Sequence, residues 1–131
     1  MASQMLDKKD EIETEVNAED QKMINLFGRL NNRKHELIKE KKFIEEDLEK
    51  ARDSQDDLFL ADDDAKFNYS MGEAFLEIDK AESESMIEKY ISQMEESIAK
   101  IDQELEKIND KHKDLKVILY GRFKNSINLE E

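Results

Sequence analysis

Three consecutive aspartates, Asp62, Asp63 and Asp64, are the residues whose type and spacing most directly suggest chemistry, because clustered carboxylates bind hard cations. They do not fit a calcium-binding EF-hand loop. In a frame that starts at Asp53, Leu58 occupies the place that needs glycine, and Asp64 replaces the terminal glutamate. Aspartate also favours turns between elements. We therefore interpret the cluster as a solvated turn and expect no metal.

The two histidines do not form a catalytic set. His112 lies at a predicted helix core position, about opposite Lys34 if the helices pair symmetrically, where a polar residue commonly fixes register. His35 lies on the flank of the other helix. There is no cysteine nucleophile, no glycine-rich phosphate loop, and no Ser/His/Asp set that this fold would bring together. We predict a protein that is not an enzyme and needs no cofactor.

The composition is typical of long helices with solvated faces, since 42% of the residues are charged and proline is absent. The formal net charge of −13 repels phosphate backbones and anionic lipids, and basic residues form only short clusters among acids, such as Lys39, Lys41 and Lys42. No apolar run reaches membrane-spanning length, and residues 1–17 lack a secretory apolar core. We expect a soluble intracellular protein that binds neither nucleic acid nor membrane.

Two apolar heptad tracks of nearly equal length indicate the elements that position these residues. The first track is Met23, Leu30, Leu37, Ile44, Ala51 and Leu58. The second is Ile87, Met94, Ile101, Ile108 and Leu115, alternating with Ile91, Ile98, Leu105, His112 and Leu119. The tracks predict one helix over 17–58, capped by Asn17, and another over 79–123, capped by Asp79. Long polar side chains at three core positions help to fix the register: Lys34, Lys41 and Gln55.

The apolar period changes to two within residues 59–78, which predicts a β-hairpin that turns at Gly72. A lone hairpin is marginally stable in water, and this one has an apolar face and two unpaired edges. We therefore predict that it joins a sheet supplied by other chains. The residues that would do so, here called the hairpin set, are Phe67, Tyr69, Met71, Ala74, Leu76 and Ile78. The alternative is that this face folds back onto the helix near Met86 and Tyr90.

Apolar residues also spread beyond the heptad positions at the helix ends far from the hairpin. An exposed patch of this kind suits apolar segments of a partner. The predicted binding residues, here called the helix-end set, are Met23, Ile24, Phe27, Leu119, Tyr120 and Phe123. The alternative is that they close the end of the coil or are covered by Ile127 and Leu129.

These predictions together describe a mainly α fold, a long antiparallel two-helix coiled coil with one β-hairpin at the bend. We expect a single elongated domain over 1–131, with a mobile tail at 1–16 and an acidic polar tail at 124–131.

Three segments resemble the prefoldin subunit 4 family: D-L-F-L-A-D-D-D at 57–64, F-N-Y-S-M-G-E-A-F at 67–75 and L-Y-G-R-F-K-N-S-I-N-L-E at 119–130. The resemblance covers about residue 17 to the C-terminus. It implies a β-type subunit of a eukaryotic heterohexamer of α- and β-type subunits, in which hairpins from six chains form a double β-barrel platform. It further implies ATP-independent capture of unfolded proteins, notably actin and tubulin, and their delivery to the cytosolic group II chaperonin.

On this resemblance the hairpin set would be platform residues, and the helix-end set would lie in the client-contacting tip. A cytoplasmic location is expected, and a nuclear pool is left open. The rival hypothesis is a structural coiled-coil tether that oligomerises through its hairpin. Stoichiometry separates the two, because a tether would self-associate alone, whereas a prefoldin subunit would join related but different chains.

Overall fold

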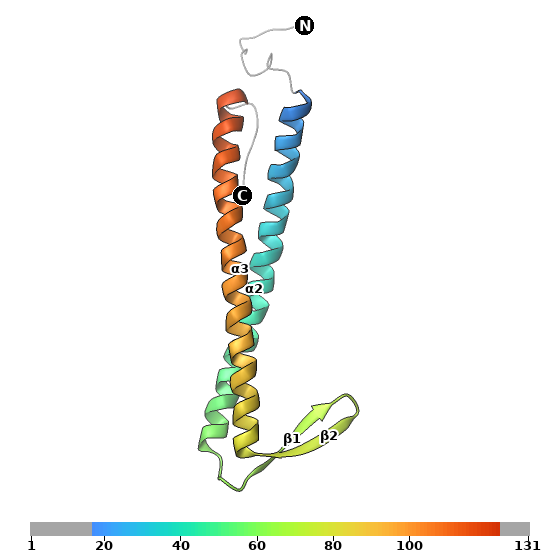
Figure 1. Cartoon of the computed structure of the whole chain (residues 1–131), viewed down its shortest axis with the longest axis vertical. Helices are drawn as coiled ribbons and strands as arrows, with labels where there is room; N and C mark the ends of the chain where they lie inside the picture. Colours follow the sequence, from blue (N-terminus) through green and yellow to red (C-terminus); the bar gives the residue numbers. More distant parts are fainter. Residues whose placement is uncertain (1–16, 124–131) are drawn as a thin grey trace. The chain divides into compact units, whose positions relative to one another are not determined.

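The computed structural model describes residues 17–123, which form two long helices with a β-hairpin between them in the chain (Figure 1). The elements are α2 (Ala18–Leu60), β1 (Lys66–Met71), β2 (Ala74–Asp79) and α3 (Lys80–Phe123). The predicted fold class is confirmed. The predicted tails, with Ile127 and Leu129, lie outside the described residues. Neither described helix has a stretch apolar enough to cross a membrane.

Each helix begins at a side-chain cap, as the sequence predicts. Asn17 Oδ1 accepts a hydrogen bond from the backbone N–H of Asp20 at 2.8 Å, and Asp20 Oδ2 accepts one from the N–H of Asn17 at 3.1 Å. This reciprocal arrangement is a capping box. At the start of α3, Asp79 Oδ1 accepts a hydrogen bond from the N–H of Glu82 at 2.8 Å. The caps satisfy N–H groups that have no partner inside a helix.

The chain divides into two compact units, and each contains part of both helices. In the first unit, residues 17–38 and 103–123 enclose a core of Phe27, Leu115, Leu119 and Phe123. In the second, residues 39–102 include the hairpin and enclose a core of Leu48, Ala51, Ile91 and Met94. Every residue of the two predicted heptad tracks is buried or half-buried. The heptad period therefore identified the surfaces along which the helices pack within each unit.

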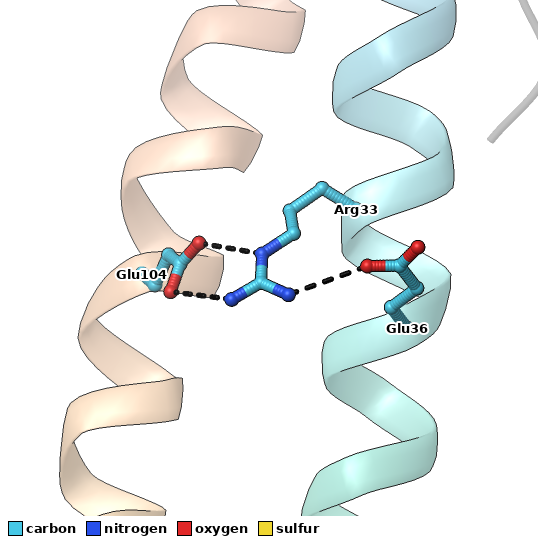
Figure 2. A network of polar contacts seen from close by, with 3 residues as sticks. All are labelled: Arg33, Glu36 and Glu104. Carbon is cyan, nitrogen blue, oxygen red and sulfur yellow. Dashed lines mark hydrogen bonds and ion pairs between the residues drawn. The ribbon is translucent and has the colours of Figure 1, made fainter.

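Ion pairs join the helices beside these cores. In the first unit, Arg33 Nε lies 2.9 Å from Glu104 Oε2 of α3, and Arg33 also contacts Glu36 of its own helix (Figure 2). The hydrogen bond to Glu104, and to a smaller extent the one to Glu36, raises the pKa of Arg33. In the second unit, Arg52 lies 2.7 Å from a carboxylate oxygen of Glu95. Because these side chains are about half exposed, each pair contributes little stability, but opposite charges favour this pairing of the helices over others.

Lys41 is one of the polar residues predicted at core positions, and it is half-buried. Its Nζ lies 2.7 Å from Asp102 Oδ1 of α3. The hydrogen bond from Lys41 to Asp102 raises the pKa of the lysine. Its charged end therefore finds a partner beside the core, which favours one register of the two helix segments.

Candidate interaction surfaces

The six residues of the hairpin set face one another in pairs across the two strands. The antiparallel register pairs Phe67 with Ile78, Tyr69 with Leu76, and Met71 with Ala74. Directly opposite residues lie on the same face of an antiparallel sheet, so the whole set forms one apolar face. The strands reverse at Gly72, whose φ of 60° is a conformation that glycine adopts without strain.

Much of this apolar face is accessible. Tyr69 is 42% exposed and Leu76 is 49% exposed, whereas Phe67 and Ile78 are half-buried nearer the helices. Ala74 is exposed, and the side chain of Met71 lies outside the description. The sheet of the described residues has only these two strands, so the outer edges of β1 and β2 remain unpaired there.

The alternative, that the face folds back onto α3, is realised only in part. Phe67 and Tyr69 line the same open groove as Met86 and Tyr90, and this groove has a volume of about 600 Å³. The base of the hairpin therefore lies near the helix without being closed over by it. Tyr69 and Leu76 still present apolar surface.

The helix-end set divides into buried and accessible residues. Phe27 is 4% exposed, Leu119 is fully buried and Phe123 is 2% exposed, since these side chains form the core of the first unit. Met23 and Ile24 are partly buried against that core, while Tyr120 is exposed. The three buried side chains cannot touch a partner unless the helices separate. Client contact by the set stays a prediction.

The accessible apolar surface at this end of α3 includes two residues that the helix-end set omits, Val117 and Ile118. Together with Tyr120 they lie within four consecutive helix positions. Heptad spacing could have separated Val117 and Ile118 from the buried residues, because both fall between the core positions Leu115 and Leu119.

His112 is a buried aromatic neighbour of the same core. Its ring stacks on Phe27, with ring centroids 4.3 Å apart and an interplanar angle of 25°. His112 is only 1% exposed. His112 therefore lies within the core, as predicted. Symmetric pairing of the helices suggested Lys34 as its neighbour, but the ring stacks on Phe27, which lies seven residues earlier on α2.

Asp20 and Arg122 form a contact between the helix ends that the sequence did not predict. Arg122 Nε donates to both carboxylate oxygens of Asp20 at 2.8 Å, and the Asp20 side chain is almost fully buried. The Arg122 guanidinium also lies 5.6 Å from the ring centroid of Phe123. Burial alone would raise the pKa of Asp20, but the hydrogen bond from Arg122, the backbone N–H of Asn17 and the arginine charge together lower it.

Comparison with known proteins identifies the family. The family model described as "Prefoldin subunit" matches residues 21–126. A "Probable prefoldin subunit 4" from Dictyostelium discoideum is 70% identical over the whole length of both chains. The chain belongs to the prefoldin subunit 4 family. Prefoldin subunit 4 of Homo sapiens is 36% identical over 88% of this chain and 87% of the relative, and that of Saccharomyces cerevisiae is 32% identical over 89% and 91%.

The prefoldin fold is also found in a solved structure. The prefoldin beta subunit from Thermococcus strain KS-1 aligns with a TM-score of 0.74 at 16% identity, over 85% of this chain and 97% of that one. The resemblance inferred from the L-A-D-D-D block, the hairpin and the C-terminal segment is therefore confirmed. Prefoldin is a co-chaperone family and not a known enzyme family.

Within this prefoldin fold the aspartate cluster follows the end of α2, and one of its members, Asp63, lies near the side chain of Lys80. Lys80 Nζ donates to the carbonyl oxygens of Phe59 at 3.1 Å and Ala61 at 2.8 Å, and it lies 3.5 Å from Asp63 Oδ1. A cation at the last carbonyls of a helix is favourable because of the helix dipole. Over residues 17–123 no three His, Cys, Asp or Glu side chains are arranged to hold a metal ion.

Proposed function

We propose that this chain works within a heterohexameric prefoldin that holds unfolded proteins, actin and tubulin among them, and passes them to the cytosolic group II chaperonin without ATP. Membership of the prefoldin subunit family makes the chain a component of the prefoldin co-chaperone complex. The proposed partners are α- and β-type prefoldin subunits. The proposed compartment is the cytoplasm, and a nuclear pool is compatible with it.

The observation that supports assembly through the hairpin is its paired, accessible apolar face. Tyr69 and Leu76 lie opposite one another and are each more than 40% exposed, and both strand edges are free in the described chain. Neighbouring strands would pair with those edges and cover this face, which removes apolar surface from water.

Charged substitutions on the two faces of the hairpin test this role. Tyr69→Glu combined with Leu76→Glu should prevent the other prefoldin subunits from co-purifying, because two buried carboxylates would have no partner. The matched control is Phe75→Glu, since Phe75 is 70% exposed and pairs with Ser70 on the opposite face. Undiminished co-purification of all subunits with the double variant would refute assembly through this face.

For client binding we propose the accessible residues at the end of α3. Ile118 is 49% exposed and Tyr120 is 42% exposed, so each can meet an apolar client segment without disturbing the core. Several weak contacts of this kind, one group on each subunit, would add by multivalency.

The test compares client capture by assembled complexes. Ile118→Ser with Tyr120→Ser should lower the amount of unfolded actin held per complex, and Phe43→Ser serves as the control because Phe43 is 60% exposed in the other unit. Equal capture by the two complexes would contradict a client role for the end of α3.

A further inference from the structure

The D-L-F-L-A-D-D-D segment at the end of α2 contains two large apolar residues that the core does not use. Leu58 is buried at its heptad position, whereas Phe59 is 73% exposed and Leu60 is 80% exposed. Lys80 holds the backbone beneath them, because its Nζ donates to the carbonyl oxygens of Phe59 and Ala61. The helix end therefore presents a fixed apolar surface that a docking partner can cover.

Phe59 also borders an open groove between α2 and α3 with a volume of about 440 Å³, here called the acidic groove. Its described lining is completed by Gln55 and by three carboxylates, Asp56 of α2 and Glu84 and Glu88 of α3. This lining contains no basic side chain and no residue of either strand, and it shares no residue with the groove beside the hairpin. The acidic groove therefore lies outside the surface proposed for assembly.

We propose that the acidic groove docks a basic amphipathic helix of a protein outside the prefoldin complex. An apolar side chain of that helix packs on Phe59 and Leu60, and lysine or arginine residues one helical turn apart lie against Glu84 and Glu88. This interaction surface goes beyond the proposed function, because it uses neither the hairpin nor the end of α3 that is proposed for clients.

The spacing and sign of the charges favour this occupant. Glu84 and Glu88 lie four residues apart on α3, so they are neighbours on one face of the helix. A partner helix has the same repeat, so two basic residues four apart can meet both carboxylates while an apolar side chain between them enters the groove. Nucleic acids and anionic lipids are disfavoured because the carboxylates repel their phosphates.

The apolar contact should supply most of the affinity. Ion pairs between exposed side chains contribute little, so removal of both glutamate charges should weaken binding only about fivefold. A large aromatic side chain at the centre of an interface contributes more, and loss of the Phe59 ring should weaken binding about thirtyfold. The carboxylates mainly select a basic partner over an acidic one.

The first test measures the binding of two fluorescent peptides to the assembled complex by anisotropy. Both peptides are amphipathic helices of about 20 residues with leucine on one face, and the basic peptide has lysine where the acidic peptide has glutamate. We expect the wild-type complex to bind the basic peptide, Phe59→Ser to weaken it about thirtyfold, and Glu84→Gln with Glu88→Gln to weaken it about fivefold.

Two matched controls separate this groove from the general negative charge of the chain. Phe43→Ser changes another phenylalanine of α2, which is 60% exposed. Glu45→Gln with Glu49→Gln removes two glutamates four residues apart, in a groove whose described lining has no aromatic residue. Both controls should change binding by less than about twofold. Equal binding of the two peptides, equal loss in the two glutamate variants, or full binding by Phe59→Ser would overturn the proposal.

The second test shows whether the surface is free in the complex. A benzophenone amino acid replaces Phe59, or Phe43 as the control, in the co-expressed complex, and the basic peptide is then added. Full assembly and crosslinks to the peptide from position 59 but not from position 43 are expected. Crosslinks from position 59 to another subunit, to a second copy or to its own chain would overturn the proposal, as would loss of assembly in Phe59→Ser, because the surface would then be covered within the complex.

Discussion

Replacing Phe27 by alanine should destabilise the chain strongly, although the helix-end set assigns this residue to client contact. Phe27 is 4% exposed, packs with Leu119 and Phe123, and stacks on His112. Phe→Ala changes in cores cost about 3–5 kcal/mol, because apolar transfer is lost and a cavity remains. The stacking on His112 is an additional loss, so we expect a value in the upper part of that range.

Phe43 provides a matched control on the same helix. It is 60% exposed, and surface substitutions usually change stability by about 0.5 kcal/mol or less. The two Phe→Ala variants should therefore differ by about 3 kcal/mol or more, which is at least a hundredfold in the unfolding equilibrium.

The assay is urea denaturation of the full-length variants, followed by circular dichroism. Hydrogen exchange then shows which unit loses protection, and for Phe27→Ala this should be residues 18–38 and 103–123. An equal loss of stability in the two variants would refute the assignment of Phe27 to the core. Reduced client binding by Phe27→Ala would then have to be attributed to contact.

Three further predictions concern the cap, the bend and the turn. Asp20 has a lowered pKa in the folded chain, so its stabilising contribution is present above its ordinary value of 3.8 and is lost as the pH falls through the folded value. The melting temperature of the wild type should thus fall more steeply below pH 3.8 than that of Asp20→Asn, and parallel curves would contradict this. Lys80→Met removes the hydrogen-bond donor to two carbonyls at the end of α2 and should lower the free energy of unfolding by about 1.5 kcal/mol. Hydrogen exchange over residues 59–64 should become faster, and unchanged exchange there would count against this role of Lys80. Gly72→Ala should lower the free energy of unfolding by about 1 kcal/mol, because the φ of Gly72 is 60°. Gly28→Ala should raise it by about 1 kcal/mol, because Gly28 lies within α2 and has open space around it. Denaturation midpoints of the two variants that move in the same direction would contradict this pair of predictions.

The elements of this fold could be predicted because their signals are local. The heptad period placed Leu37 and Ile91 in the core, and both are buried. The change to a period of two, together with Gly72, predicted the hairpin and which of its residues share a face. Asn17 and Asp79 marked the helix starts because capping depends on residues within three positions.

The remaining features depend on how distant segments are offset, which local patterns do not encode. The pairing of Asp20 with Arg122 and the stacking of Phe27 on His112 both require the offset between α2 and α3. The groove that β1 and α3 line together depends on the angle at which the hairpin leaves α3. For the same reason the helix-end set combined buried with accessible residues, since apolar type alone does not determine which side chains face the partner helix.

We propose that this chain joins related but different subunits through its hairpin. The most direct test is the native mass of the complex isolated through a tag on the full-length chain. We expect one defined assembly of six chains, which contains this subunit together with other prefoldin subunits. A mass that corresponds only to copies of this chain would refute assembly with other prefoldin subunits and would support the coiled-coil tether.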